Sequence, residues 1–138
     1  MKRFLNVVAA VAVTVPGLAY ALAAPGLQVE QVEDIAADEM QQRIEEGTAP
    51  IILDVRRADE FAAGHLPGAV NISHDELGDR LDELGIELGE ELVVYCRSGR
   101  RAGIAEKILG EAGFTNLRDL EGHWLEWKAA GRPTESEE

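Results

Sequence analysis

Four apolar residues, Leu92-Val93-Val94-Tyr95, lead directly into the polar segment Cys96-Arg97-Ser98-Gly99-Arg100-Arg101. A continuous apolar run of this length is typical of a strand buried on both faces, as in a parallel sheet. A second such run begins at Ile51-Ile52-Leu53 and continues into Asp54-Val55-Arg56. Helical patterns alternate with these strands, so we expect an α/β fold with a mostly parallel central sheet and helices on both faces.

The other expected elements follow from periodicity and from helix-end signals. We expect helices over 37–46, 58–63, about 102–112 and 124–130, and strands over 29–32, 69–72 and 114–120. Ser73 and Glu76 have capping-box spacing, which predicts a helix from there to about Leu84. Residues 24–34 are a linker and first strand, and residues 134–138 form an acidic tail that we expect to be frayed.

The first 23 residues have the features of a secretory signal peptide. Basic Lys2-Arg3 precedes an almost wholly apolar run over 4–15, and Pro16-Gly17 interrupts it. Small residues then predict cleavage after Ala21 or Ala23. An uncleaved anchor is the alternative, although the run is shorter than the about 20 residues of a spanning helix. We therefore expect a periplasmic or secreted protein whose mature form is not embedded in a membrane.

The chain is acidic, with 13 Lys and Arg against 26 Asp and Glu and a net charge of −13. Without the signal peptide, 11 basic residues face the same 26 acidic ones, a net charge of −15. Such a surface disfavours nucleic acid and anionic membranes as partners. At 138 residues, the length suits one domain, and we expect a monomer.

Cys96 is the only cysteine, at the predicted carboxyl end of a buried strand. Ligand sites of open α/β sheets lie at such ends, where loop amides and the next helix N-terminus converge. These amides and the nearby arginines should stabilise a thiolate and bind a small oxyanion, while Gly99 lets the backbone curl. We identify Cys96 as the catalytic candidate and the following residues as substrate-binding candidates: Arg97, Ser98, Gly99, Arg100 and Arg101.

Each of these assignments has a plainer alternative. A lone cysteine is more often a small buried apolar residue, and any one of the three arginines can simply be solvated surface. The strand end, the glycine-bearing loop and the arginine cluster together favour the reactive interpretation of Cys96.

Several segments, in order, resemble the rhodanese family over about 35–133. The matching segments are Leu53-Asp54-Val55-Arg56, Glu60-Phe61, Gly64-His65-Leu66-Pro67-Gly68-Ala69-Val70-Asn71-Ile72, Val93-Val94-Tyr95-Cys96-Arg97-Ser98-Gly99-Arg100-Arg101-Ala102, Leu120-Glu121-Gly122, Trp127 and Gly131-Arg132-Pro133. With its leader, the chain is similar to small periplasmic single-domain members. It departs from the family at His123, where a second glycine is usual; this concerns one wall of the site.

The resemblance implies a single rhodanese-like domain over 35–133 and a thiosulfate sulfurtransferase activity. Cys96 would take a sulfur from thiosulfate or a similar donor as a persulfide and pass it to cyanide or a thiol. Related phosphatases and arsenate reductases have an arginine six positions after the cysteine; here that residue is Ala102, and Arg101 is the fifth. The shorter loop resembles that of the sulfurtransferases.

The remaining polar residues are expected to support the site. Asp54 and Arg56 should form a hydrogen-bonded pair that orders the loops, and His65 should be a structural hydrogen bonder. The three histidines lack ligand spacing, so no metal site is expected. No glycine-rich nucleotide loop is present, so no organic cofactor is expected either.

Two other functions stay open. A non-catalytic rhodanese-like module for sulfur binding or sensing is one, although such modules often lack the cysteine. A thiol redox protein is the other, and it would need a partner thiol because Cys96 has no resolving cysteine in its own chain.

Overall fold

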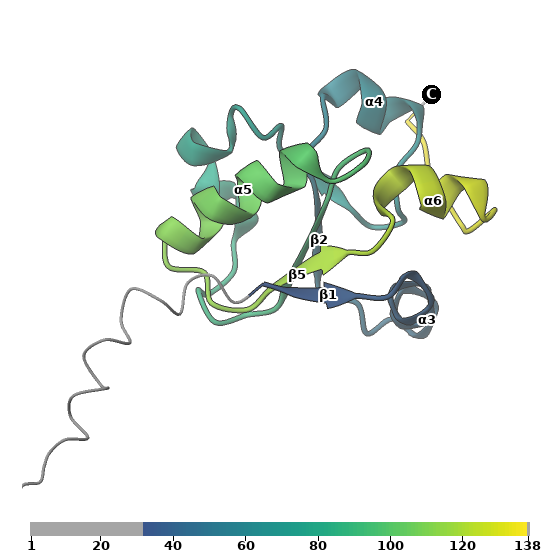
Figure 1. Cartoon of the computed structure of the whole chain (residues 1–138), viewed down its shortest axis with the longest axis horizontal. Coiled ribbons are helices and arrows are strands. Elements are labelled where there is room, and N and C mark those ends of the chain that lie inside the picture. Colours follow the sequence, from purple (N-terminus) through teal and green to yellow (C-terminus); the bar gives the residue numbers. More distant parts are fainter. Residues whose placement is uncertain (1–31, 138) are drawn as a thin grey trace, which may run out of the picture. The chain divides into compact units, whose positions relative to one another are not determined.

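The computed structural model describes residues 32–137, in which five strands form one parallel sheet of order β1-β5-β4-β2-β3 (Figure 1). The strands are β1 (Glu33–Ile35), β2 (Ile51–Asp54), β3 (Val70–Asn71), β4 (Leu92–Tyr95) and β5 (Leu117–Leu120). The helices are α3 (Ala37–Glu46), α4 (Ala58–Ala63), α5 (Arg100–Glu111) and α6 (His123–Ala129), with 3-10 helices η3 (Leu77–Asp79) and η4 (Leu81–Leu84). The expected α/β class is confirmed.

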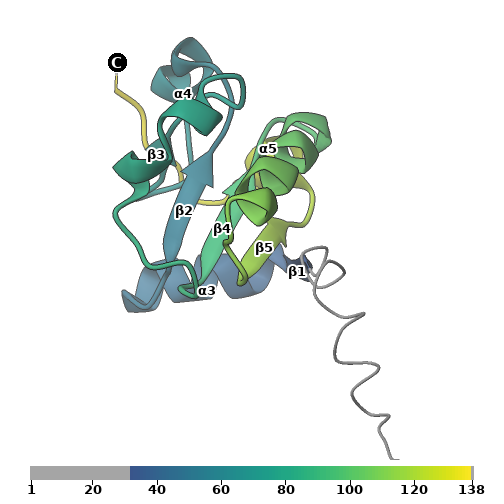
Figure 2. The same cartoon turned by 90° about the vertical axis from the view of Figure 1, so that its left-hand side faces the viewer.

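The two faces of the sheet bury separate apolar clusters. Leu53 and Val94 point to one face, where they pack with α5, η3 and η4. Ile52, Val93 and Tyr95 alternate with them and point to the other face, where α3 and α6 cover them. This period of two arises because successive side chains of a strand leave opposite faces. The helices accordingly lie on both sides of the sheet (Figures 1 and 2).

The register of the central strands brings the two predicted site segments together. Asp54 of β2 pairs with Tyr95 of β4, so both strands end at the same level. The N–H of Val55 donates to the carbonyl of Tyr95 at 3.0 Å. Arg56 and Cys96, which follow these residues, therefore leave the sheet at the same carboxyl edge.

The predicted capping-box helix over 73–84 is wrong. The hydroxyl of Ser73 donates to Asp75 at 2.6 Å, and the carboxylate of Glu76 accepts from Arg80 at 2.7 Å, so neither side chain caps a helix. The segment instead forms η3 and η4. Gly78 lies in this stretch, and glycine costs a helix interior about 1 kcal/mol relative to alanine. The apolar spacing still serves burial, because Leu77 and Leu84 are buried.

The expected frayed tail is also wrong for residues 134–137. Glu135 and His65 exchange two backbone hydrogen bonds of 2.9 Å in an antiparallel bridge. The N–H of Glu137 donates to the carbonyl of Ala62, so the end of the described chain lies along α4, as Figure 2 shows. The Glu135 carboxylate also accepts from the N–H of Gly68 at 3.0 Å. Residues 134–137, which we call the C-terminal strap, thus form backbone hydrogen bonds with α4 and with the turn that follows it.

The first described strand, β1, starts at Glu33, just after the segment 29–32 where the sequence predicts it. Most of that segment, like the signal peptide over 1–23, lies outside the described residues. Within 32–137, no helix combines the length and apolar character needed to cross a bilayer.

Candidate active site

Cys96 lies where β4 gives way to the loop before α5, with 1% of its surface exposed. Its sulfur belongs to the face of the sheet that α5 covers. The N–H of Gly99 donates to Sγ, with 3.0 Å between nitrogen and sulfur. A backbone donor at this distance stabilises negative charge on sulfur more than a neutral thiol.

Gly99 gives the loop its shape. Its φ of 123° lies in a region that side chains avoid, and it precedes the first residue of α5. The cysteine therefore faces the N-terminus of a helix of 12 residues, whose dipole favours an anion. Only three residues separate Cys96 from α5, in keeping with the short loop seen in the sequence.

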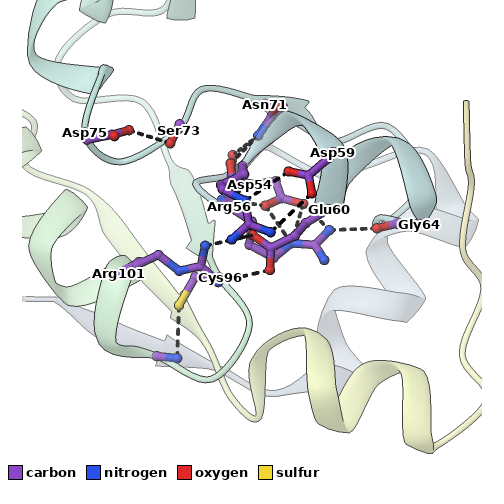
Figure 3. Close-up of polar contacts among 12 residues, drawn as sticks. Asp54, Arg56, Asp59, Glu60, Gly64, Asn71, Ser73, Asp75, Cys96 and Arg101 are labelled. Atoms are coloured by element: carbon purple, nitrogen blue, oxygen red, sulfur yellow. Dashed lines mark hydrogen bonds and ion pairs between the residues drawn. The ribbon is translucent and has the colours of Figure 1, made fainter.

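The three loop arginines have different environments. Arg101 is half-buried beside Cys96 and forms two hydrogen bonds to Glu60 of α4, 2.8 and 3.3 Å long (Figure 3). The hydrogen bond from Arg101 is the main cause that lowers the pKa of Glu60 to about 2. Arg97 and Arg100 are exposed and form no ion pair with any residue in 32–137. Arg101 is thus fixed, while Arg97 and Arg100 keep their guanidinium groups available.

Asp54 and Arg56 form the predicted buried pair (Figure 3). Arg56 donates from Nε and Nη2 to the two carboxylate oxygens of Asp54, at 2.9 and 2.6 Å, and from Nη2 to the carbonyl of Gly64 at 2.7 Å. Its guanidinium lies over the ring of Trp124, 4.6 Å from the centroid. The pair thereby ties the end of β2 to the end of α4 and to α6. Burial opposes the charge of Arg56, but the bond and charge of Asp54 outweigh it and raise the pKa of Arg56.

His65 has the expected structural role. Its Nδ1–H donates to the carbonyl of Phe61 at 2.7 Å, and its ring stacks on the Phe61 ring with centroids 3.7 Å apart. These contacts join the turn that follows α4 to Phe61 of the helix, so His65 orders that turn.

His123 is a site residue that the sequence-based assignment missed. Its Nδ1 accepts the backbone N–H of Cys96 at 3.2 Å, and its Nε2 lies 3.3 Å from Asp119 Oδ2. The next residues of α6 donate backbone N–H groups to the Cys96 loop: Trp124 to the Cys96 carbonyl and Leu125 to that of Arg97. The signal in the sequence was the histidine itself, which stands where the resembling family usually has glycine.

Glu106 and Asp119 were also not foreseen, and they lie behind His123. Burial, with a hydrogen bond to Asp119, raises the pKa of Glu106 well above its usual range. Burial acts in the same direction on Asp119, but hydrogen bonds with His123 and Glu106 hold its pKa below the ordinary value. Asp119 is therefore the carboxylate of the pair, and Glu106 holds the proton.

The described residues include no group of three His, Cys, Asp or Glu side chains placed to hold a metal ion. The chemistry available to this site is that of a single sulfur with a backbone donor, a helix N-terminus and three arginines around it.

Comparison with known proteins assigns the chain to a family. The family model for the rhodanese-like domain matches residues 36–130. The HTH-type transcriptional regulator Rv0324 of Mycobacterium tuberculosis is 37% identical over 83% of this chain and 50% of its own length. Thiosulfate sulfurtransferase 16, chloroplastic, of Arabidopsis thaliana is 34% identical over 61% of this chain and 78% of its own.

Solved structures agree with these matches. The human single-domain sulfurtransferase TSTD1 superposes with a TM-score of 0.64 and 29% identity, over 72% of this chain and 97% of that one. Among the first curated relatives, the chain spans about half of each relative's length.

Proposed function

The chain belongs to the rhodanese-like domain family, and from that premise we propose that it is a sulfurtransferase that carries sulfur on Cys96. The observation behind the proposal is the 3.0 Å contact between the Gly99 N–H and the Cys96 sulfur at the end of β4. A sulfur held this way is stabilised as the thiolate, the form that attacks. The arginines around it suit a donor that carries oxyanion charge.

The proposed reaction has two steps. The Cys96 thiolate attacks the outer sulfur of thiosulfate, a new S–S bond forms, and the old S–S bond breaks with its electron pair leaving on sulfite. The enzyme then carries a Cys96 persulfide. Cyanide or a thiolate attacks the terminal sulfur, and the Cys96 thiolate leaves; with cyanide the product is thiocyanate. Dividing the transfer between two displacements gives ping-pong kinetics.

The loop residues have distinct proposed roles in this reaction. Arg97 and Arg100, exposed and without ion pairs in the described part of the chain, are the groups for the donor's oxygens. Arg101 is held by Glu60 and lies beside the sulfur, where its charge favours the thiolate and the persulfide anion. The loop amides of Ser98 and Gly99 are the proposed donors to the terminal sulfur, and the Gly99 N–H already contacts Sγ.

Replacement of the cysteine tests the proposal. Cys96→Ala and Cys96→Ser keep a small side chain at a buried position, so both should fold and both should lose thiosulfate:cyanide transfer to the background rate. Initial rates over a grid of both substrates should give parallel double-reciprocal lines for the wild type. Transfer that survives in both variants would exclude Cys96 as the sulfur carrier.

A sensing or binding module is the second candidate, because the relative named as a transcriptional regulator is 37% identical over 83% of this chain. Such a module would accept sulfur on Cys96 without turning over. Repeated turnover with thiosulfate and cyanide favours the enzyme, whereas one equivalent of sulfur taken up and none released favours the module.

We also propose that the protein is exported to the periplasm or the exterior. The mass of the protein isolated from a fraction free of membranes tests this, because cleavage after Ala21 or Ala23 shortens the chain by 21 or 23 residues.

A further inference from the structure

His123 has an unusual backbone conformation. Among residues 32–137 it is the one residue other than glycine with positive φ, at 51°. Side chains adopt this left-handed conformation uncommonly, and histidine, asparagine and aspartate are the types that tolerate it best. Its side chain is also largely buried, with 8% of the residue exposed. Because this backbone conformation is unfavourable for a side chain, the contacts of the buried His123 ring must compensate for it.

The His123 ring bonds to one end of the Cys96 loop and lies close to the other. Its Nδ1 accepts the N–H of Cys96 at 3.2 Å. Its Nε2 and Cδ2 lie 3.2 and 3.4 Å from where a Cβ would stand on Gly99. Cys96 and Gly99 are the two residues joined by the N–H···Sγ contact. The ring therefore lies against the two residues whose N–H···Sγ contact stabilises the sulfur.

These contacts define the protonation state of His123. A nitrogen that accepts an N–H needs its lone pair, so Nδ1 carries no proton and the ring proton is on Nε2. That proton faces the carboxylate of Asp119, 3.3 Å away. Against the effect of burial, the hydrogen bonds with His123 and Glu106 hold the pKa of Asp119 below its ordinary value, which keeps Asp119 a carboxylate. A doubly protonated ring would turn an N–H toward the N–H of Cys96 and break the bond.

The carboxyl pair supports this arrangement from α5 and β5. Oε2 of Glu106 is buried and has no hydrogen-bond partner among residues 32–137, which a neutral acid tolerates far better than a carboxylate. Glu106 is therefore the proton donor, and Asp119 the charged acceptor. In the resulting chain of interactions, the protonated Glu106 and the Nε2–H of His123 both face Asp119. The N–H of Cys96 donates to Nδ1 of His123.

We propose that His123 is a positioning residue for Cys96, whose neutral imidazole holds the Cys96 amide and the Gly99 end of the loop so that the sulfur stays against the Gly99 N–H. The inference rests on the proposed function only in that the positioned sulfur is the reacting one. Asp119 and Glu106 act through His123, by fixing the tautomer that leaves Nδ1 free to accept.

Two substitutions separate the hydrogen bond from the backbone conformation. His123→Gly removes the ring and relieves the positive φ. His123→Asn also tolerates that φ and keeps a side-chain acceptor, the amide oxygen. A lost hydrogen bond of ordinary strength corresponds to about a three- to tenfold effect on rate. Ile44→Ala on α3, which packs on the face of the sheet opposite to the one that Cys96 joins, is the control for general destabilisation.

The first readout is alkylation of Cys96 by iodoacetamide, which reports this sulfur alone because the chain has one cysteine. We expect His123→Gly to lower the alkylation rate constant and kcat for transfer by about three- to tenfold, with KM for thiosulfate unchanged. His123→Asn should recover most of the loss, and Ile44→Ala should match the wild type. Wild-type alkylation in His123→Gly, or no recovery in His123→Asn, would overturn the proposal.

The second readout needs no variant. The ¹⁵N chemical shifts of the His123 ring in the wild-type protein at neutral pH should show the neutral tautomer with its proton on Nε2. A proton on Nδ1 would refute the inference even if His123→Gly did not fold. Neither alkylation nor these shifts require sulfur transfer, so failure of the proposed function, seen as transfer that survives Cys96→Ala, is distinguished from failure of the role of His123.

Discussion

Arg101 and Glu60 join α5 to α4 beside the candidate sulfur, through hydrogen bonds of 2.8 and 3.3 Å between guanidinium and carboxylate. Each side chain is 18% exposed, so water screens this pair less than it screens a surface pair. The loop before α5 begins with Cys96 and ends against this pair. The ion pair therefore fixes a positive charge beside the sulfur, while the neighbouring Arg97 and Arg100 are exposed.

The Glu60–Arg101 pair should make stability depend on acid pH. The folded protein lowers the pKa of Glu60 from 4.5 to about 2. A depressed pKa adds stability that is complete above the unfolded value and is lost as pH falls toward the folded value. Glu60→Gln should therefore cost about 1–3 kcal/mol at pH 7 after allowance for partial exposure. Urea unfolding from pH 7 downward should show this difference shrinking between 4.5 and about 2.

Glu111→Gln is the control for that series. Its ion pair with Lys107 is exposed, at 65% and 75% of the two side chains, and such pairs contribute about 0–1 kcal/mol. A loss in Glu60→Gln that is no larger than in Glu111→Gln, or that persists at the lowest pH, would contradict the assignment.

Gly99 should not tolerate a side chain. Its φ of 123° strains any L residue, and a Cβ would approach the His123 ring to 3.2 Å. Gly99→Ala should destabilise the fold by about 1–3 kcal/mol and slow transfer, because the N–H that contacts Sγ must shift. Thermal unfolding and kcat measure the two effects.

Gly103→Ala, within the helix that Gly99 precedes, is the matched control. A Cβ there has open space, and alanine in a helix interior is favoured over glycine by about 0.5–1 kcal/mol. This variant should be as stable as the wild type or more so, with unchanged kcat. Equal behaviour of the two alanine variants would show that the loop does not depend on the Gly99 conformation.

Arg97 and Arg100 should act on donor binding. Because both are exposed and unpaired within the described chain, Arg97→Gln and Arg100→Gln should leave stability within about 0.5 kcal/mol of the wild type. KM for thiosulfate should rise by about three- to tenfold in each variant. The difference in KM between wild type and variant should shrink as salt is added. Lys107→Gln, toward the far end of α5, serves as the charge control. An unchanged KM in the double variant would remove these arginines from the donor site.

The buried pair between Asp54 and Arg56 should be costly to break and cheaper to remove as a whole. Arg56→Met leaves the carboxylate of Asp54 buried without its partner and should cost about 3–5 kcal/mol. Adding Asp54→Leu to Arg56→Met should restore part of that loss. Denaturant unfolding of both single variants and the double variant gives the coupling energy; additive losses would contradict the pair.

Local sequence patterns predicted the parts of the site that lie on strands. The apolar runs ending at Asp54 and Tyr95 predicted two buried strands of a parallel sheet, and therefore the carboxyl edge where Arg56 and Cys96 emerge. The structure adds that the two strands are neighbours. The position of Cys96 and the Asp54–Arg56 pair follow from that edge. Helix spacing and helix-end signals likewise predicted α3 and α4 with the bounds that the structure has.

Features that depend on contacts distant in sequence could not be predicted. The bond of His123 to Cys96 spans 27 positions, and that of Arg101 to Glu60 spans 41. The pairing of Glu135 with His65 turned an expected frayed end into the C-terminal strap. The capping-box helix failed for a different, local reason, because the side chains of Ser73 and Glu76 bond to Asp75 and Arg80 instead of capping a helix.

The most direct test of the account is the mass of Cys96 after the purified protein is treated with thiosulfate. We predict a gain of one sulfur atom on the peptide that contains Cys96, no gain in Cys96→Ser, and complete removal of the added mass by cyanide with release of thiocyanate. Oxidation to a sulfinic acid adds nearly the same mass but is not reversed by cyanide. A gain that cyanide does not remove, or an unmodified Cys96 after every sulfur donor tested, would contradict a persulfide carried by this residue.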